Sequence, residues 1–227
     1  MEHPLVRLEG IGKSYPEEEG DGVPILAGVN VTFARGALTA IVGRSGSGKT
    51  TLLNLIAALD RPDRGRVWIG PTDLTGLNDE DSTRFRRRHL GFVFQFFNLV
   101  PALTVLENVR FPLALNGMDD AAGRSRALEL LHRVGLAGRA GAFPDRLSGG
   151  ERQRAAIARA LVHGPMLALA DEPTGNLDHK TGQEVMALMT AMVREEGLTL
   201  IMVTHSPDFA SQADRVLRLH EGKLIDL

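Results

Sequence analysis

Short apolar runs alternate along this chain with longer segments in which apolar side chains recur every three or four residues. The runs are typical of buried strands, and the recurring pattern is typical of helices that pack by one face. Strands are expected at residues 37–42, 90–94, 166–170 and 198–203, and helices at 50–60, 78–89 and 180–197. Strands that alternate with helices predict an α/β fold with a mostly parallel sheet, covered on both faces.

The N-terminal region carries a different pattern. Residues 5–10 and 25–36 alternate apolar and polar positions, which favours strands, and Gly28 and Gly36 are expected at turns. An antiparallel β subdomain is therefore predicted ahead of the parallel sheet.

The middle of the chain reads as helical from residue 104 to 138, with Leu128, Leu131 and Val134 expected on one apolar face. The last segment, 214–227, predicts a β-hairpin that turns at Glu221 and Gly222.

These patterns predict one domain over residues 1–227. Its β and core parts are expected at about 1–94 and 164–227, with an inserted helical subdomain at about 95–163.

Composition narrows the class of protein. A content of 43% hydrophobic and 24% charged residues is that of an ordinary globular chain, and a net charge of -2 gives no general attraction to nucleic acid. The cluster at residues 84–88 is expected to be a solvated helix face with internal ion pairs, and the acidic run at 17–22 a solvated loop. We expect no signal peptide and no membrane span, and cysteine is absent.

A complete G-x-x-x-x-G-K-[ST] motif follows the strand expected at 37–42. Glycines in such a loop let main-chain N–H groups surround phosphate, Lys49 supplies a positive charge, and the Thr50 hydroxyl can bind Mg²⁺. The strand before the motif and the helix after it favour phosphate binding over a merely flexible loop. The candidate phosphate-binding residues are Gly43, Arg44, Ser45, Gly46, Ser47, Gly48, Lys49, Thr50 and Thr51.

Two carboxylates end the strand expected at 166–170. Beside a phosphate loop, Asp171 would hold Mg²⁺, directly or through water, and Glu172 would orient an attacking water. The alternative is that Asp171 only caps the following turn.

A second glycine-rich helix start, Leu-Ser-Gly-Gly-Glu, lies at residues 147–151. Ser148 and Glu151 form the pattern of a capping box. Gly149 and Gly150 weaken a first helical turn unless something must approach its main chain closely.

The order and spacing of these motifs resemble the ATP-binding subunits of ABC transporters over nearly the whole chain. The carriers are the loop from Gly43, Gln95 after "GFVF", "LSGGERQR", "MLALADEP", "GNLD" and His205 after "LIMVT". The resemblance implies ATP and Mg²⁺ as ligands and ATP hydrolysis as the reaction.

The resemblance also implies particular roles. Tyr15 would stack on adenine, although a strand-edge role is equally open from sequence. Gln95 would touch Mg²⁺ or the attacking water, and His205 would hold the γ-phosphate. Residues 148–151 would face the γ-phosphate of a second copy in a head-to-tail dimer, whose interface would include Asp178.

"ADEPTGNLD" and "GFVFQFFNLVPALTVLENV" look similar to the branch that serves lipoprotein release and macrolide export. This implies a separate membrane permease as partner, a place at the cytoplasmic face of the inner membrane, and no nucleic acid. Phe96, Phe97, Leu99 and Val100 are expected to help form the permease-binding groove. Two alternative functions stay open. One is an ABC ATPase that acts on a macromolecular assembly instead of a permease. The other is a P-loop kinase or GTPase, but that function leaves residues 148–151 unexplained.

Overall fold

The computed structural model describes residues 4–16 and 23–227. Its contacts divide the chain into two units, Met1–Arg86 with Thr199–Leu227, and Arg87–Leu198. The acidic run at 17–22 lies outside the described residues.

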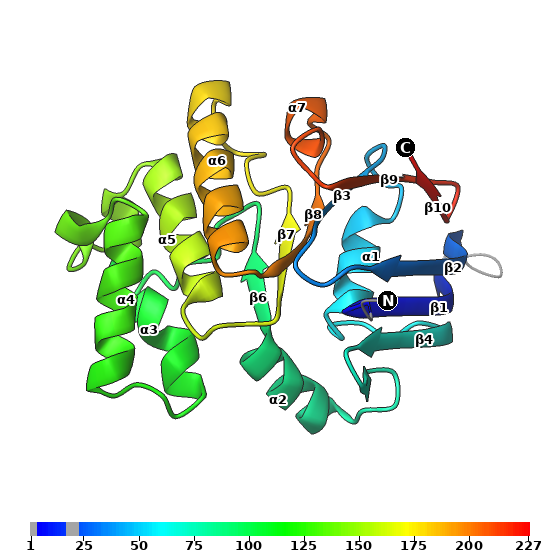
Figure 1. The fold of residues 1–227 in the computed structure, drawn as a ribbon, viewed down its shortest axis with the longest axis horizontal. Coiled ribbons are helices and arrows are strands. Elements are labelled where there is room, and N and C mark those ends of the chain that lie inside the picture. Colours follow the sequence, from blue (N-terminus) through cyan, green and yellow to red (C-terminus); the bar gives the residue numbers. More distant parts are fainter. Residues whose placement is uncertain (1–3, 17–22) are drawn as a thin grey trace. The chain divides into compact units, whose positions relative to one another are not determined.

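The first unit contains the predicted antiparallel sheet. The strands are β1 (Val6–Tyr15), β2 (Val23–Phe33), β4 (Arg64–Ile69) and β5 (Thr72–Asp73), in the order β2-β1-β4-β5 (Figure 1). Alternate residues of β1 are buried, as expected where one face of a sheet packs on a core.

The first unit also contains β3 (Leu38–Val42), β8 (Thr199–Val203), β9 (Arg215–His220) and β10 (Lys223–Asp226), in the order β10-β9-β3-β8. β3 runs parallel to both β8 and β9, whereas β9 and β10 form the predicted hairpin. Its turn has left-handed φ angles of 48° at Glu221 and 72° at Gly222, which suits a tight hairpin. The unit's helices are α1 (Lys49–Ile56) and α7 (Pro207–Ala210).

The second unit pairs β6 (Leu90–Val93) in parallel with β7 (Leu167–Asp171). Its helices are α3 (Val105–Leu115), α4 (Ala121–Arg133), α5 (Gly149–Leu161) and α6 (His179–Glu195), with the short helices η1 (Ala137–Arg139) and η2 (Pro144–Arg146). Figure 1 shows α3, α4 and α5 packed beside one another. α2 (Asp79–His89) crosses the boundary between the two units in the sequence.

The predicted fold class is confirmed: the chain has an N-terminal antiparallel sheet, mostly parallel strands with helices between them, and a run of helices over residues 95–163. The division of the chain into a core and a helical subdomain with those bounds stays a prediction. In the part of the chain that is described, no helix is long and apolar enough to cross a membrane.

Two local expectations were wrong. Gly28 lies inside β2, where its φ of 71° and the shift of register against β1 make a bulge rather than a turn. Leu131 and Val134 are buried as expected, but Leu128 is 40% exposed, because the buried face of α4 is formed by Ala127, Leu130 and Leu131 and Leu128 lies at its margin.

One glycine explains how closely β6 approaches α5. A Cβ atom on Gly91 would lie against the carbonyl oxygen of Ala160 at less than van der Waals distance. The carbonyl belongs to helical main chain and cannot easily move away, so this contact requires a residue without a side chain.

We expect Gly91→Ala to lower the free energy of unfolding by about 1–3 kcal/mol, the usual cost of overpacking. Gly138→Ala is the matched control, because a Cβ at Gly138 meets nothing within 4 Å. Chemical denaturation of both variants checks this; equal midpoints for the two would contradict the close contact.

Candidate active site

The glycine-rich loop leads from β3 directly into α1. Gly46 and Gly48 have φ angles of 75° and 97°, which side chains disfavour. α1 begins at this loop with no side-chain cap and no acidic residue in its first turn. By contrast, α3, α4, α5 and α6 each begin with a side-chain cap. The N–H groups and the positive end of the α1 dipole are therefore left for an anion.

Lys49 is buried, and its ammonium donates hydrogen bonds of 3.0 Å to the carbonyl oxygens of Gly43 and Arg44. The Ser47 hydroxyl oxygen is also buried, yet it has no hydrogen-bond partner. A Cβ on Gly43 would come within 2.7 Å of that oxygen. The loop thus holds a cation and an unsatisfied hydroxyl in a space kept open by glycine, which fits a phosphate group.

His205 follows β8, the parallel neighbour of β3. The Thr204 amide donates a 3.1 Å hydrogen bond to the carbonyl of Ile41, so the two strands end at the same edge. The exposed His205 therefore lies at the same edge as the phosphate loop, and ligands commonly bind at this carboxyl edge of parallel strands.

Tyr15 ends β1 and is 41% exposed. Its hydroxyl donates a 2.9 Å hydrogen bond to Asp60, and the Lys13 ammonium lies 5.2 Å from the ring centroid. Burial alone would raise the pKa of Asp60, but hydrogen bonds from Lys13, the Arg61 main chain and Tyr15 outweigh it and lower that pKa. The ring is therefore held in a fixed orientation, which a stacking platform needs.

The other expected catalytic side chains lie in the second unit. Asp171 is the last residue of β7, Glu172 follows it, and Gln95 comes soon after β6. Since β6 and β7 are parallel, these side chains lie at one strand edge. Glu172 has a left-handed φ of 46°, a strained conformation typical of functional positions.

The predicted capping box at the start of α5 is confirmed. The Glu151 amide donates to the Ser148 hydroxyl at 3.2 Å, and the Glu151 carboxylate accepts from the Ser148 amide at 2.8 Å. The Ser148 main-chain hydrogen bond is the chief cause of a lowered pKa for Glu151.

Packing inside the chain explains much of the need for two glycines here. A Cβ on Gly150 would lie 2.5 Å from the methyl of Thr181 on α6, and one on Gly149 would lie 3.1 Å from Leu177. Gly150 is buried, and the contact with Thr181 on α6 is by itself enough to require a residue without a side chain here. Thr181 also donates its amide to Asp178, which caps α6.

The predicted solvated face with internal ion pairs is found for only part of the basic cluster at 84–88. Arg84 pairs with Glu80 and Asp81 on the exposed face of α2. Arg86 instead turns inward and donates to the carbonyl of Ala58, and burial lowers its pKa.

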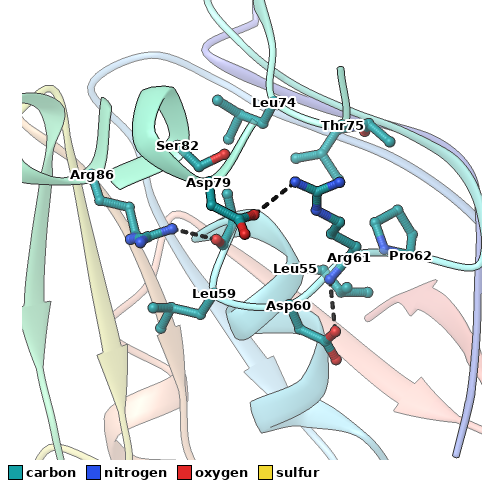
Figure 2. A pocket seen from close by; sticks show the side chains of 12 residues that line it. Leu55, Leu59, Asp60, Arg61, Pro62, Leu74, Thr75, Asp79, Ser82 and Arg86 are labelled. Carbon is teal, nitrogen blue, oxygen red and sulfur yellow. Dashed lines mark hydrogen bonds and ion pairs between the residues drawn. The ribbon is translucent and has the colours of Figure 1, made fainter. Parts of the chain in front are cut away.

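A separate cavity of about 270 Å³ lies at the C-terminal end of α1, the end away from the phosphate loop. Figure 2 shows Arg61 pointing at Asp79, and Arg86 reaching the loop after α1. The charged groups of this cavity therefore join the loop after α1 to α2, and the cavity is distinct from the phosphate loop.

The sequence-predicted residues fall in two sets, one in each unit. The phosphate loop, Tyr15 and His205 belong to the first unit; Gln95, Asp171, Glu172, residues 148–151 and Asp178 belong to the second.

Residues 26–175 match the protein family described as ABC transporter. The chain belongs to this family. It is 48% identical over 222 residues to an uncharacterised ABC transporter ATP-binding protein of Mycobacterium tuberculosis, covering 98% of this chain and 89% of that one. It is 46% identical to LolD of Xanthomonas campestris, a lipoprotein-releasing system ATP-binding protein, covering 98% and 93%.

Among solved structures, the dimeric post-hydrolysis state of the ATP-binding cassette MJ0796, bound to ADP and Pi, is similar, with a TM-score of 0.89. The two chains are 41% identical, and the likeness covers 98% of each. This ABC transporter subunit is therefore an ATPase.

Sequence reasoning missed two supports of the candidate site in this ABC ATPase. Asp60 anchors Tyr15 from 45 positions away, and Asn176 bonds to the main chain of Gln95 from 81 positions away. The motif "GNLD" contains this asparagine, but only the tertiary structure places it against Gln95.

We expect Gly150→Ala to destabilise the protein, because its methyl would collide with Thr181. Thr181→Ser removes that methyl and should restore most of the loss in the double variant. Thermal unfolding of both variants is the measurement. A double variant no more stable than Gly150→Ala alone would show that Thr181 is not the obstacle.

Proposed function

We propose that this chain binds ATP at the loop from Gly43 to Thr51 and hydrolyses it with Glu172 as the residue that polarises water. The observation that carries the proposal is the uncapped start of α1, with the buried Lys49 inside its loop. An anion there gains the main-chain amides, the helix dipole and the Lys49 charge together.

The proposed roles divide between binding and chemistry. Lys49 and the loop amides neutralise charge on the phosphoryl oxygens, and Tyr15 stacks on adenine with its ring held by Asp60 and Lys13. Glu172 accepts a hydrogen bond from the attacking water and orients it. Gln95 and His205 position the γ-phosphate.

Magnesium fits the donor types in these positions. The Thr50 hydroxyl, the Asp171 carboxylate and the Gln95 amide oxygen are hard oxygen ligands of the kind it prefers. In the described part of the chain, no group of three or more His, Cys, Asp or Glu residues could form a metal cage. Mg²⁺ held by these oxygens would supply positive charge that stabilises the negative charge of the phosphates.

A second copy of the chain is the proposed partner in hydrolysis. The solved structures of the similar cassette MJ0796 are dimeric, one with ADP and Pi bound. In the proposed head-to-tail dimer, the start of α5, with Ser148, Gly149, Gly150 and Glu151, faces the nucleotide held by the partner's phosphate loop. Asp178 lies at that interface.

We further propose that the dimer drives a separate membrane permease from the cytoplasmic face of the inner membrane, in lipoprotein or lipid extrusion or in efflux. The support is the 46% identity to LolD and the motifs shared with that branch. Phe96, 72% exposed, is the best candidate for permease contact, whereas Phe97 packs under Arg152. An ABC ATPase on a macromolecular assembly stays the alternative, and co-purification with a soluble partner in place of a permease would favour it.

We expect Glu172→Gln to bind ATP with nearly normal affinity but to hydrolyse it at least about 100-fold more slowly, because the amide polarises water poorly. The variant should accumulate as an ATP-bound dimer in size-exclusion chromatography. Hydrolysis near the wild-type rate would move the catalytic role to another residue.

We expect Gly149→Asp to abolish hydrolysis while ATP binding to the monomer is kept, because the added carboxylate would repel the partner's γ-phosphate. Gly141→Asp is the matched control, since Gly141 is exposed and a Cβ there meets nothing within 4 Å. Equilibrium ATP binding and steady-state hydrolysis check both variants. Loss of ATP binding by monomeric Gly149→Asp would place this turn in its own chain's site.

A further inference from the structure

The loop after β6 is held in an unusual conformation. Phe97 and Asn98 have successive left-handed φ angles of 61° and 50°, which are costly for residues other than glycine. The guanidinium of Arg159 on α5 donates to the carbonyl oxygens of both residues, at 2.9 Å for Phe97. The segment that begins at Gln95 is therefore fixed on its C-terminal side by the helix that starts at residue 149.

On its N-terminal side the same segment is fixed by the turn after Glu172. The side-chain amide of Asn176 donates a 2.8 Å hydrogen bond to the carbonyl oxygen of Gln95. The turn that carries Asn176 is itself closed by a 3.0 Å hydrogen bond from the Gly175 amide to the carbonyl of Glu172. Gln95 and Glu172 are thus joined through a short, rigid connection.

Gly175 completes this arrangement by leaving room. A Cβ at this position would lie 2.9 Å from the Gln95 side-chain nitrogen and 3.3 Å from the neighbouring carbons. The φ of Gly175 is not among the left-handed angles, so glycine is needed for space rather than for backbone freedom. A methyl group at this position would displace the end of the Gln95 side chain from the place that it occupies.

We infer that Gly175 and Asn176 are positioning residues for Gln95: Asn176 fixes its main chain, and Gly175 accommodates its side chain. This inference rests on the proposed role of Gln95 at the γ-phosphate. It explains why glycine and asparagine occur together: a side chain at 175 displaces the Gln95 amide, and a residue without a donor at 176 releases its carbonyl. Both changes alter the geometry between Gln95 and Glu172.

The first test uses the nucleotide-free chain. Asn176→Ala should speed hydrogen exchange in peptides covering residues 94–99 and leave exchange elsewhere unchanged. Gln183→Ala is the matched control: it removes an exposed side-chain amide from the adjoining helix α6 and should leave hydrogen exchange unchanged at residues 94–99 and elsewhere. Unchanged exchange at 94–99 in Asn176→Ala would overturn the role assigned to Asn176.

The second test is a pair of double-mutant cycles on ATP hydrolysis by the full chain. Asn176→Ala and Gly175→Ala should each lower kcat by about ten- to a hundredfold, as small misplacements of a catalytic group do, with KM for ATP nearly unchanged. In a Gln95→Ala background neither change should lower kcat further. Truncation of Gln95 both removes the positioned group and makes room for a methyl at 175.

The outcomes separate this inference from the function on which it rests. If Gln95→Ala by itself leaves kcat unchanged, the proposed role of Gln95 fails. If Gln95→Ala lowers kcat but the changes at 175 and 176 do not, or if their effects add to it, the positioning inference fails. If Asn176→Ala is too unstable to assay, the Gly175→Ala cycle gives an independent answer. The methyl group at 175 displaces only the flexible end of the Gln95 side chain, so this variant is expected to fold.

Discussion

The parallel pairing of buried strands is the constraint on which the rest of this structure depends. β3 pairs with β8, and β6 with β7, and nearly all their residues are buried. Parallel partners end at the same edge, so the residues after each strand become neighbours although they are far apart in sequence. The phosphate loop and His205 meet in this way in one unit, as do Gln95 and Asp171 in the other.

Close packing then determines where glycine is required around these strands. Gly91 lets β6 approach α5, Gly150 lets α5 approach α6, and Gly175 makes room for Gln95. An added methyl would lie closer than van der Waals distance to an atom of α5 at Gly91 and to an atom of α6 at Gly150. Gly150, which belongs to a glycine-rich helix start in the sequence, is therefore required by packing within the chain.

Polar contacts supply the orientation that packing does not. Asp60 holds the ring of Tyr15, Arg159 holds the strained carbonyls of Phe97 and Asn98, and Asn176 holds Gln95. Each contact joins residues that are far apart in sequence and favours one arrangement of the loop involved. Such preorganisation lowers the cost of binding and of reaching the transition state.

The sequence by itself determined the α/β class, the phosphate loop and the capping box at Ser148 and Glu151, because these depend on local periodicity and on residues within one turn. It misplaced Gly28 and Leu128, since a bulge depends on strand register and a helix face depends on its partner. The reason for Gly150 and the contacts of Asn176 and Asp60 were decided only by the tertiary structure. Those contacts join residues 31 to 81 positions apart, and no local pattern encodes which side chains will meet across such separations.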